Sequence, residues 1–136
     1  MTDSHESVYQ FLITMGAEQD LRDCRDEDAY AAAFITVFLR ELRSDPSYLE
    51  NMIDERFSNE KVRDIDGVWS LQDLRINAYR TKFVELHNWR LIFIVDRATA
   101  RIGLFAVMHR SDDYEQNKEL WADIEREFDE LGFTKY

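Results

Sequence analysis

Apolar residues recur every three or four positions in the first half of the chain, which is the spacing of one face of an amphipathic helix. The strongest such stretch begins after Asp26 or Asp28, either of which can cap it, and continues to about Arg43. Its predicted apolar face consists of Tyr30, Phe34, Val37, Phe38 and Leu42. The pattern therefore predicts a helix here that buries one side against a core.

A second helix is predicted directly after the first. Asp45 suits the N-cap position, and Pro46 suits the first helical residue because a proline has no N–H to leave unbonded there. The predicted inner face consists of Tyr48, Leu49, Met52, Ile53 and Phe57. Because the connection is so short, we expect the two helices to form an antiparallel hairpin.

The N-terminal region has a pattern that fits two kinds of element. Residues 8–15 show helical spacing and also strand-like alternation, and we favour the helix. The helical reading uses Val8, Phe11, Leu12 and Met15, and the alternating reading uses Tyr9, Phe11, Ile13 and Met15. The stretch from Glu18 to Asp28 is rich in charged residues and is predicted to be a connector.

The periodicity changes after Asn59, and three strand-like runs follow a turn at Asp66-Gly67. The runs are Tyr79 to Leu86, Trp89 to Val95 and Ile102 to Met108. Short connections at 87–88 and 96–101 require antiparallel neighbours. A last helix is predicted from Asp113 to about Leu131, with an apolar face of Leu120, Trp121, Ile124 and Phe128. The predicted fold class is α+β: an N-terminal helical hairpin packed on a small antiparallel β-sheet meander, with a C-terminal helix.

Length and composition fit one soluble domain over residues 1–136. The single cysteine, Cys24, cannot form an internal disulfide, which is typical of a reducing compartment. The N-terminus lacks the pattern of a signal peptide, and no apolar run approaches the roughly 20 residues of a membrane span. These features predict a cytoplasmic protein with no membrane partner.

Charge is distributed unevenly along the chain. The formal net charge of -11 argues against nucleic-acid binding, but residues 61–110 carry 9 basic and 5 acidic side chains. Residues 1–60 carry 5 basic and 14 acidic side chains, and residues 111–136 carry 3 basic and 9 acidic ones. The middle of the chain is thus a basic island between acidic flanks, although charge also fluctuates along chains that have no such function.

The basic island contains a candidate site. Because strand side chains alternate, Arg80 and Lys82 share one strand face. Arg90 begins the next predicted strand, and Arg110 and Tyr114 follow the third one. These side chains could converge near the strand ends, where cations would hold a phosphate and stabilise charge that develops on it. A cationic strand is also often only a solvated face.

No metal or cofactor is predicted from the sequence. His5, His87 and His109 have no metal-ligand spacing, and no glycine-rich phosphate loop is present. Cys24 lies among acids, which should raise its thiol pKa and lower its reactivity.

The segment YRTKFVELHNWRLIFIVDRATARIGLFAVMHRSDDY, from Tyr79 to Tyr114, resembles the core of the RelE/ParE toxin superfamily. The likeness consists of a Tyr-Arg pair entering a strand, an aromatic-Arg step followed by apolar residues, an acidic turn, His-Arg and a closing tyrosine. With the two preceding helices it extends over residues 28–115, and residues 1–25 would be an N-terminal extension. The resemblance is to the branch of ribosome-dependent nucleases, which carry basic residues and a tyrosine in their site.

This resemblance implies a toxin of a type II toxin-antitoxin system, an endoribonuclease that cleaves mRNA on the ribosome by metal-independent attack of the 2′-hydroxyl. Its expected partners are mRNA, the ribosome and a cognate antitoxin protein. The implied catalytic residues are Arg80, Lys82, Arg90, Arg110 and Tyr114, and the implied RNA-binding residues are Arg80, Lys82, His109 and Arg75. By this resemblance, Lys82 or Tyr114 would transfer a proton, while Arg90 and Arg110 would hold the phosphate.

Two other functions fit the same resemblance. One is a toxin of the ParE kind that acts on DNA gyrase, for which Lys82, Arg90 and Tyr114 would be dispensable. The other is a binding module that has the fold without the catalysis, for which the acidic flanks would matter more than the basic face.

Overall fold

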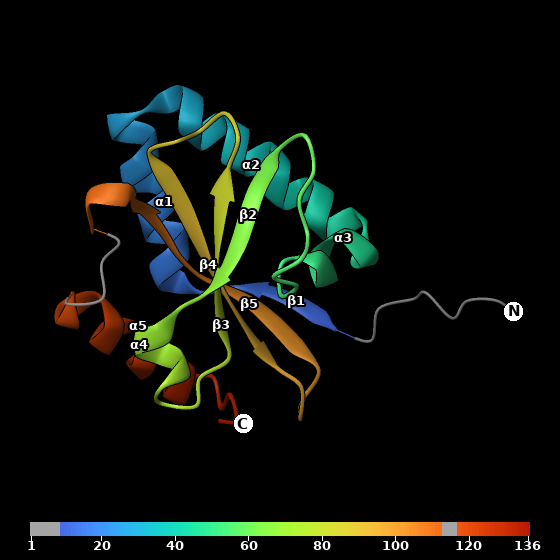
Figure 1. Cartoon of the computed structure of the whole chain (residues 1–136). Helices are drawn as coiled ribbons and strands as arrows, with labels where there is room; N and C mark the ends of the chain where they lie inside the picture. The colour runs from blue at the N-terminus through green and yellow to red at the C-terminus, as the bar shows by residue number, and fades with distance from the viewer. Residues whose placement is uncertain (1–8, 113–116) are drawn as a thin grey trace, which may run out of the picture.

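The computed structural model describes residues 9–112 and 117–136 of the chain (Figure 1). In chain order the elements are β1 (Gln10–Ile13), α1 (Met15–Glu27), α2 (Ala29–Ser44), α3 (Pro46–Asn51), β2 (Val62–Gly67), α4 (Trp69–Gln72), β3 (Ala78–Phe83), β4 (Trp89–Asp96), β5 (Arg101–His109), the 3-10 turn η1 (Arg110–Asp112) and α5 (Lys118–Glu130). This is an α+β fold, as the sequence predicts: N-terminal helices pack on a mostly antiparallel sheet, and a helix follows the sheet.

Side-chain caps fix where four of the helices begin. Thr14, Asp28, Asp45 and Asn117 each accept a hydrogen bond from the backbone N–H three residues further along, which satisfies a donor that a helix start otherwise leaves unbonded. Of the two predicted caps for α2, the structure uses Asp28. The predicted Asp45 cap and the first-turn position of Pro46 in α3 are both confirmed.

The sheet has five strands in the order β1-β5-β4-β3-β2. The three predicted strands form the antiparallel meander β3-β4-β5, and β2 extends it antiparallel on one side. On the other side β1 pairs in parallel with the first half of β5, where Gln10 lies opposite Arg101 and Ile13 opposite Leu104. The sequence predicts no strand at β2, and at β1 the strand is the alternative to the favoured helix.

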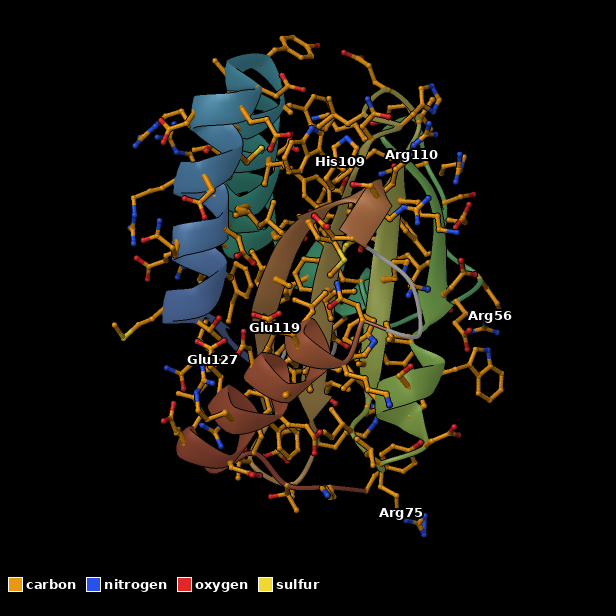
Figure 2. All side chains as sticks on the ribbon, turned by 90° about the vertical axis from the view of Figure 1, so that its left-hand side faces the viewer. Arg56, Arg75, His109, Arg110, Glu119 and Glu127 are labelled. Atoms are coloured by element: carbon orange, nitrogen blue, oxygen red, sulfur yellow. The ribbon has the colours of Figure 1, made fainter. Side chains whose placement is uncertain are left out.

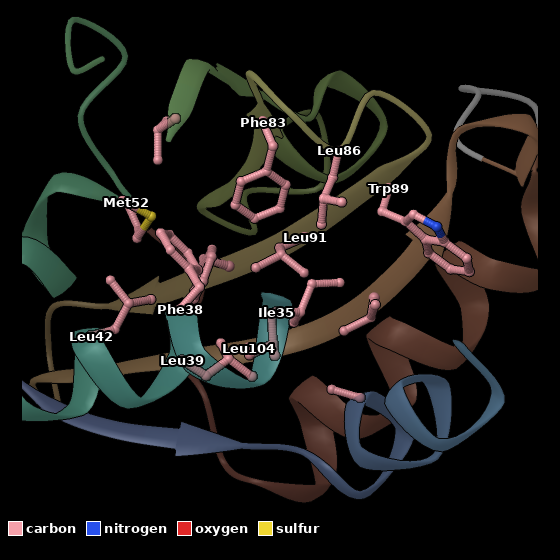
Figure 3. Packing of buried hydrophobic residues seen from close by; sticks show 14 of the residues in the cluster. Ile35, Phe38, Leu39, Leu42, Met52, Phe83, Leu86, Trp89, Leu91 and Leu104 are labelled. Carbon is pink, nitrogen blue, oxygen red and sulfur yellow. The ribbon is translucent and has the colours of Figure 1, made fainter. Parts of the chain in front are cut away.

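Two apolar cores lie on opposite faces of the sheet. The first joins α1, α2 and α3 to one face through residues such as Phe38, Phe83 and Leu91, and the rings of Phe38 and Phe83 meet edge to face at 5.1 Å (Figure 3). The second joins α4 and α5 to the other face and includes Ile92 and Trp121. The molecule therefore has three layers, with the sheet in the middle.

The last helix is held to the first by a hydrogen bond. The Glu127 carboxylate of α5 accepts from the Gly16 N–H at the start of α1 at 2.8 Å. A carboxylate is favoured there by the positive end of the helix dipole. Two helices more than a hundred residues apart in sequence thus meet at one edge of the sheet.

The N-terminal predictions are wrong in two respects. Residues 10–13 form a strand, and the predicted connector from Glu18 to Asp28 is most of helix α1. The predicted hairpin joins α2 to the helix that follows it, but that helix, α3, has only six residues. The long helix that packs along α2 is α1. In α2, Phe38 and Leu42 are buried as predicted, but Tyr30 and Val37 are exposed. Ile35 and Leu39 take their place in the core.

The predictions for the second half of the chain are largely confirmed. The strands begin and end within a few residues of the predicted runs, and Trp121, Ile124 and Phe128 of α5 are buried. The predicted start of the last helix at Asp113 lies outside the described residues. None of the helices within residues 9–112 and 117–136 is long and apolar enough to cross a membrane.

Candidate functional site

Lys82 and Arg90 are direct partners across β3 and β4. Antiparallel partners lie roughly 4.5–5.5 Å apart at their Cα atoms and project to the same face. Ile92 alternates with Arg90 along β4 and belongs to the α5 core, so both cations lie on the face that α4 and α5 cover. Lys82 and Arg90 thus lie side by side, as predicted, because the register of β3 and β4 pairs them.

Arg80 joins these two cations. It lies two residues before Lys82 on β3 and opposite Ile92 of β4, on the same face. Thr81, between them, faces the other way, where its hydroxyl lies 3.6 Å from the Met52 sulfur. Arg80, Lys82 and Arg90 are each half-buried, and we call these three side chains the cation row.

Two carboxylates of β2 lie beside the cation row. Asp64 is the partner of Lys82, and Asp66 is the partner of Arg80. The Lys82 Nζ also lies 3.4 Å from Asp66 Oδ2. The three cations therefore share their face with two acids, which lowers the positive potential that a phosphate would meet. Sequence reasoning missed both acids because it placed a turn, and no strand, at residues 66–67.

Arg110 lies at the same end of the sheet as Arg90. It follows the pair formed by Trp89 and His109, and its N–H donates to the Asn88 carbonyl at 2.7 Å (Figure 2). It is the first residue of η1 and is exposed to solvent. Its backbone thus lies near the start of β4, and its side chain is open to solvent. Tyr114, the remaining predicted catalytic residue, lies outside the described residues.

The other two candidates lie away from the cation row. His109 alternates with Met108 of the α5 core, so it faces the opposite side of the sheet, where its ring meets Trp89 edge to face at 5.4 Å. Arg75 follows α4 at the other end of the molecule from Arg110 (Figure 2). Its guanidinium lies 5.8 Å from the ring centre of Tyr136. The structure therefore does not join His109 or Arg75 to the cation row.

Trp89 and Cys24 have structural positions. Trp89 is 5% exposed, and its indole N–H donates to Asp28 Oδ2 at 3.2 Å, so it is a buried structural residue. Burial raises the pKa of the Cys24 thiol to about 11, and the carboxylates of Asp28 and Glu27 add to the effect. The predicted low reactivity of Cys24 is therefore supported, with burial as its main cause.

A second group of charges lies between α1 and α5. The Asp20 carboxylate accepts from the Val107 N–H at 3.1 Å, where β5 continues past the end of β1. Burial is the main cause that raises the Asp20 pKa to about 6. The Val107 N–H opposes the shift in pKa, and the carboxylates of Asp23, Glu127 and Asp123 contribute to it. Asp20 thus provides an acceptor for the Val107 N–H of β5, although other carboxylates lie close to its own.

Within the described ranges, no three His, Cys, Asp or Glu residues are grouped so as to hold a metal ion. Comparison with protein-family models, curated protein sequences and solved structures gives no match to this chain.

Proposed function

We propose that this protein is an endoribonuclease toxin of the RelE kind, which cleaves ribosome-bound mRNA and is held in check by a cognate antitoxin. One observation carries the proposal: Arg80, Lys82 and Arg90 lie together on one sheet face, with Arg110 at the same end. A meander that follows helices, with basic residues at these positions, is the arrangement that the sequence resemblance implies.

The chemistry requires only phosphate binding and proton transfer. The 2′-oxygen of RNA attacks the adjacent phosphorus as its proton passes to a base. The bond from phosphorus to the 5′-oxygen then breaks, and that oxygen takes up a proton, which leaves a 2′,3′-cyclic phosphate and a 5′-hydroxyl. Arg90 and Arg110 stabilise the negative charge on the phosphate oxygens. Lys82 or Tyr114 transfers a proton, and Arg80 holds the message backbone.

The half-buried position of the cation row strengthens this assignment. A charge that is partly removed from water interacts with a bound phosphate more strongly than a fully exposed one does. A guanidinium also presents several N–H donors in a plane, which matches the geometry of phosphate oxygens. The substrate supplies its own nucleophile, so the proposal includes no metal ion or cofactor.

A second candidate is a binding module without catalysis. The ion pair between Lys82 and Asp66 favours it, because a lysine that is held by a carboxylate is less available to a phosphate. Asp64, opposite Lys82 on β2, acts in the same direction. In this reading the fold recognises a partner protein and the acidic flanks form the contact.

The test compares the wild type with the Arg90→Ala/Arg110→Ala double variant, expressed in a bacterium. Growth, protein synthesis and the 5′ ends of messages are followed together. A matched control is Arg22→Ala/Arg40→Ala, which removes two exposed arginines from α1 and α2. Circular dichroism and thermal melting of the purified variants check that each one folds.

We expect growth arrest and new message ends with the wild type and the control, and neither with the double variant. Arrest that persists in a folded double variant overturns the nuclease. Intact messages with accumulating DNA breaks indicate a gyrase poison instead, and a wild type that causes no arrest favours the binding module.

A further inference from the structure

A pocket opens next to the cation row, at the end of β2 and the start of β3. Its lining includes Trp69 and Asp73 of the α4 region, Glu55, Arg80 and Tyr136. Arg80 belongs both to this lining and to the cation row, so the two sites are continuous. We infer that this pocket binds one nucleobase that carries an exocyclic amino group, stacked on Trp69, while the adjoining phosphate lies on the cation row.

Trp69 is the main reason for this inference. Its side chain is 70% exposed, whereas Trp89 and Trp121 are each 5% exposed. Indole is a large flat surface, and stacking of a base on such a ring is a common means of holding single-stranded nucleic acid. Helix α4 is anchored beneath it by Leu71, which is fully buried, so the exposed ring stands on a fixed support.

The polar groups of the pocket are held in place by hydrogen bonds. The Gln72 amide donates to Asn77 Oδ1 at 3.2 Å and to the Ala78 carbonyl at 2.9 Å. The Tyr136 hydroxyl donates to Gln72 Oε1 at 2.5 Å, and Arg75 lies over the Tyr136 ring. These contacts fix one wall of the pocket before any ligand arrives, which lowers the entropic cost of binding.

The charges of the pocket indicate what it binds. Glu55, Asp66 and Asp73 bring carboxylates to its lining, which repel a phosphate and accept hydrogen bonds. Adenine, cytosine and guanine each present an amino group with two N–H donors, whereas uracil presents two carbonyl acceptors and a single ring N–H. The phosphate is therefore excluded from the pocket and held by Arg80, while an amino-bearing base is favoured inside it.

A protein partner fits this surface less well than a base does. Protein interfaces are depleted of charged residues at their centre, but Glu55, Asp66, Asp73 and Arg80 lie in the same pocket as the indole. The inference rests on the proposed nuclease function, because the cation row must hold RNA for the pocket to meet a base.

The test uses short 2′-O-methyl oligonucleotides, which have no free 2′-hydroxyl and cannot be cleaved. Oligoadenylate and oligoinosinate of equal length are compared, because adenine has an amino donor at position 6, where hypoxanthine has a carbonyl acceptor and carries its proton on N1 instead. Binding is followed by tryptophan fluorescence and by anisotropy of a labelled strand. The variants are Trp69→Ala, Trp69→Phe, the Glu55→Gln/Asp73→Asn pair and Arg90→Ala, which removes one member of the cation row. Tyr30→Ala is the matched control, an exposed aromatic on α2 across the sheet.

We expect oligoadenylate to bind the wild type more tightly than oligoinosinate and to quench the exposed indole. Trp69→Ala should weaken oligoadenylate binding roughly ten- to hundredfold, because each stacked base contributes strongly to affinity. Trp69→Phe should lose the fluorescence change but keep most of the affinity, and Tyr30→Ala should match the wild type. The Glu55→Gln/Asp73→Asn pair should reduce the preference for adenine over hypoxanthine.

Three results would overturn the inference. If Trp69→Ala binds as tightly as the wild type while Arg90→Ala binds weakly, the pocket is wrong and the nuclease proposal stands. If the wild type binds none of the oligonucleotides but cleaves messages on ribosomes, the pocket is again wrong and the nuclease proposal again stands. If Trp69→Ala keeps RNA affinity but loses a partner protein, the indole is a protein contact.

Discussion

The Lys82 ammonium lies 3.4 Å from the Asp66 carboxylate, and this ion pair joins the cation row to strand β2. The Lys82 side chain is 24% exposed and that of Asp66 is 50% exposed, so water screens the pair only in part. Any phosphate that binds at Lys82 competes with this carboxylate. The ion pair therefore connects β2, which was not predicted from the sequence, to Lys82, which was predicted as a site residue.

Asp66→Asn should strengthen RNA binding. The change releases Lys82 from its ion pair and removes one negative charge, which should raise affinity by about two- to fivefold at low salt. The salt dependence of log K should steepen by about 0.7, because one more phosphate is neutralised. Fluorescence anisotropy at several salt concentrations measures both effects. Asp26→Asn makes the same charge change on an exposed part of α1, and an equal gain there would contradict the local explanation.

Asp20→Asn should change how stability depends on pH. The folded-state pKa of Asp20 is raised to about 6 from 3.8, so the folded protein holds this proton more tightly than the unfolded chain does. The free energy of unfolding should therefore fall as pH rises from about 4 to 6 and then level off. After allowance for solvent screening we expect this to amount to about 1–2 kcal/mol.

The asparagine variant lacks this titration but keeps an oxygen that can accept from the Val107 N–H. It should be more stable than the wild type at pH 7.5 and nearly equal to it at pH 4.5, as measured by urea unfolding at both values. The control is Asp26→Asn, which removes a charge from an exposed position on the same helix. A stability difference that does not vary with pH would show that Asp20 titrates normally.

Asp96→Ala should destabilise the fold. Asp96 is 1% exposed, and its carboxylate accepts from the Ala98, Thr99 and Thr134 N–H groups and from the Thr99 hydroxyl. Burial alone would raise the Asp96 pKa, but these hydrogen bonds outweigh it and lower the pKa. The alanine variant should lose about 2–4 kcal/mol at pH 7, because buried donors lose their acceptor.

The Asp96 contribution should also depend on pH in the opposite sense to that of Asp20. A lowered pKa gives stability that is present above the usual range of aspartate and is lost as pH falls through the folded-state value. The difference between wild type and Asp96→Ala should therefore shrink towards pH 2 in chemical denaturation. Asp96→Asn, which keeps one acceptor oxygen, should lose less than the alanine variant at pH 7.

Gly103→Ala should weaken the packing of the β1 edge. A Cβ at residue 103 would lie 2.8 Å from a ring carbon of Phe105 and 3.0 Å from a methyl of Leu12, so these side chains must move. We expect a loss of about 1–3 kcal/mol in the free energy of unfolding. Gly67→Ala is the control, since its nearest neighbour would be 3.7 Å away. Equal losses at both positions would point to backbone effects and not to overpacking.

Sequence reasoning succeeded where local signals were strong. Asp45-Pro46 identifies the start of α3 because a cap and a proline act within one turn. The meander could be predicted because the connections between β3, β4 and β5 are short and because β4 and β5 contain continuous apolar runs. The shared face of Arg80, Lys82 and Arg90 follows from alternation along two paired strands.

It failed where the apolar signal was weak or irregular. Helix α1 buries only small residues, Ala17 and Cys24, so its charged surface dominates the pattern. In β2 a register shift between Val62 and Asp64 places Val62 and Ile65 in the same core, three residues apart, which breaks the alternation of a regular strand. Without β2, neither Asp64 nor Asp66 could be placed beside the cations.

The pairing of β1 with β5 has a consequence for the order of folding. Gln10 pairs with Arg101, about ninety residues further along the chain, whereas β3, β4 and β5 pair with their neighbours in sequence. Closing so long a loop is slow, and the local meander does not have to wait for it. During synthesis the first strand therefore remains without its partner until β5 has left the ribosome. The cation row can assemble earlier, which makes β1 docking the step most exposed to misfolding.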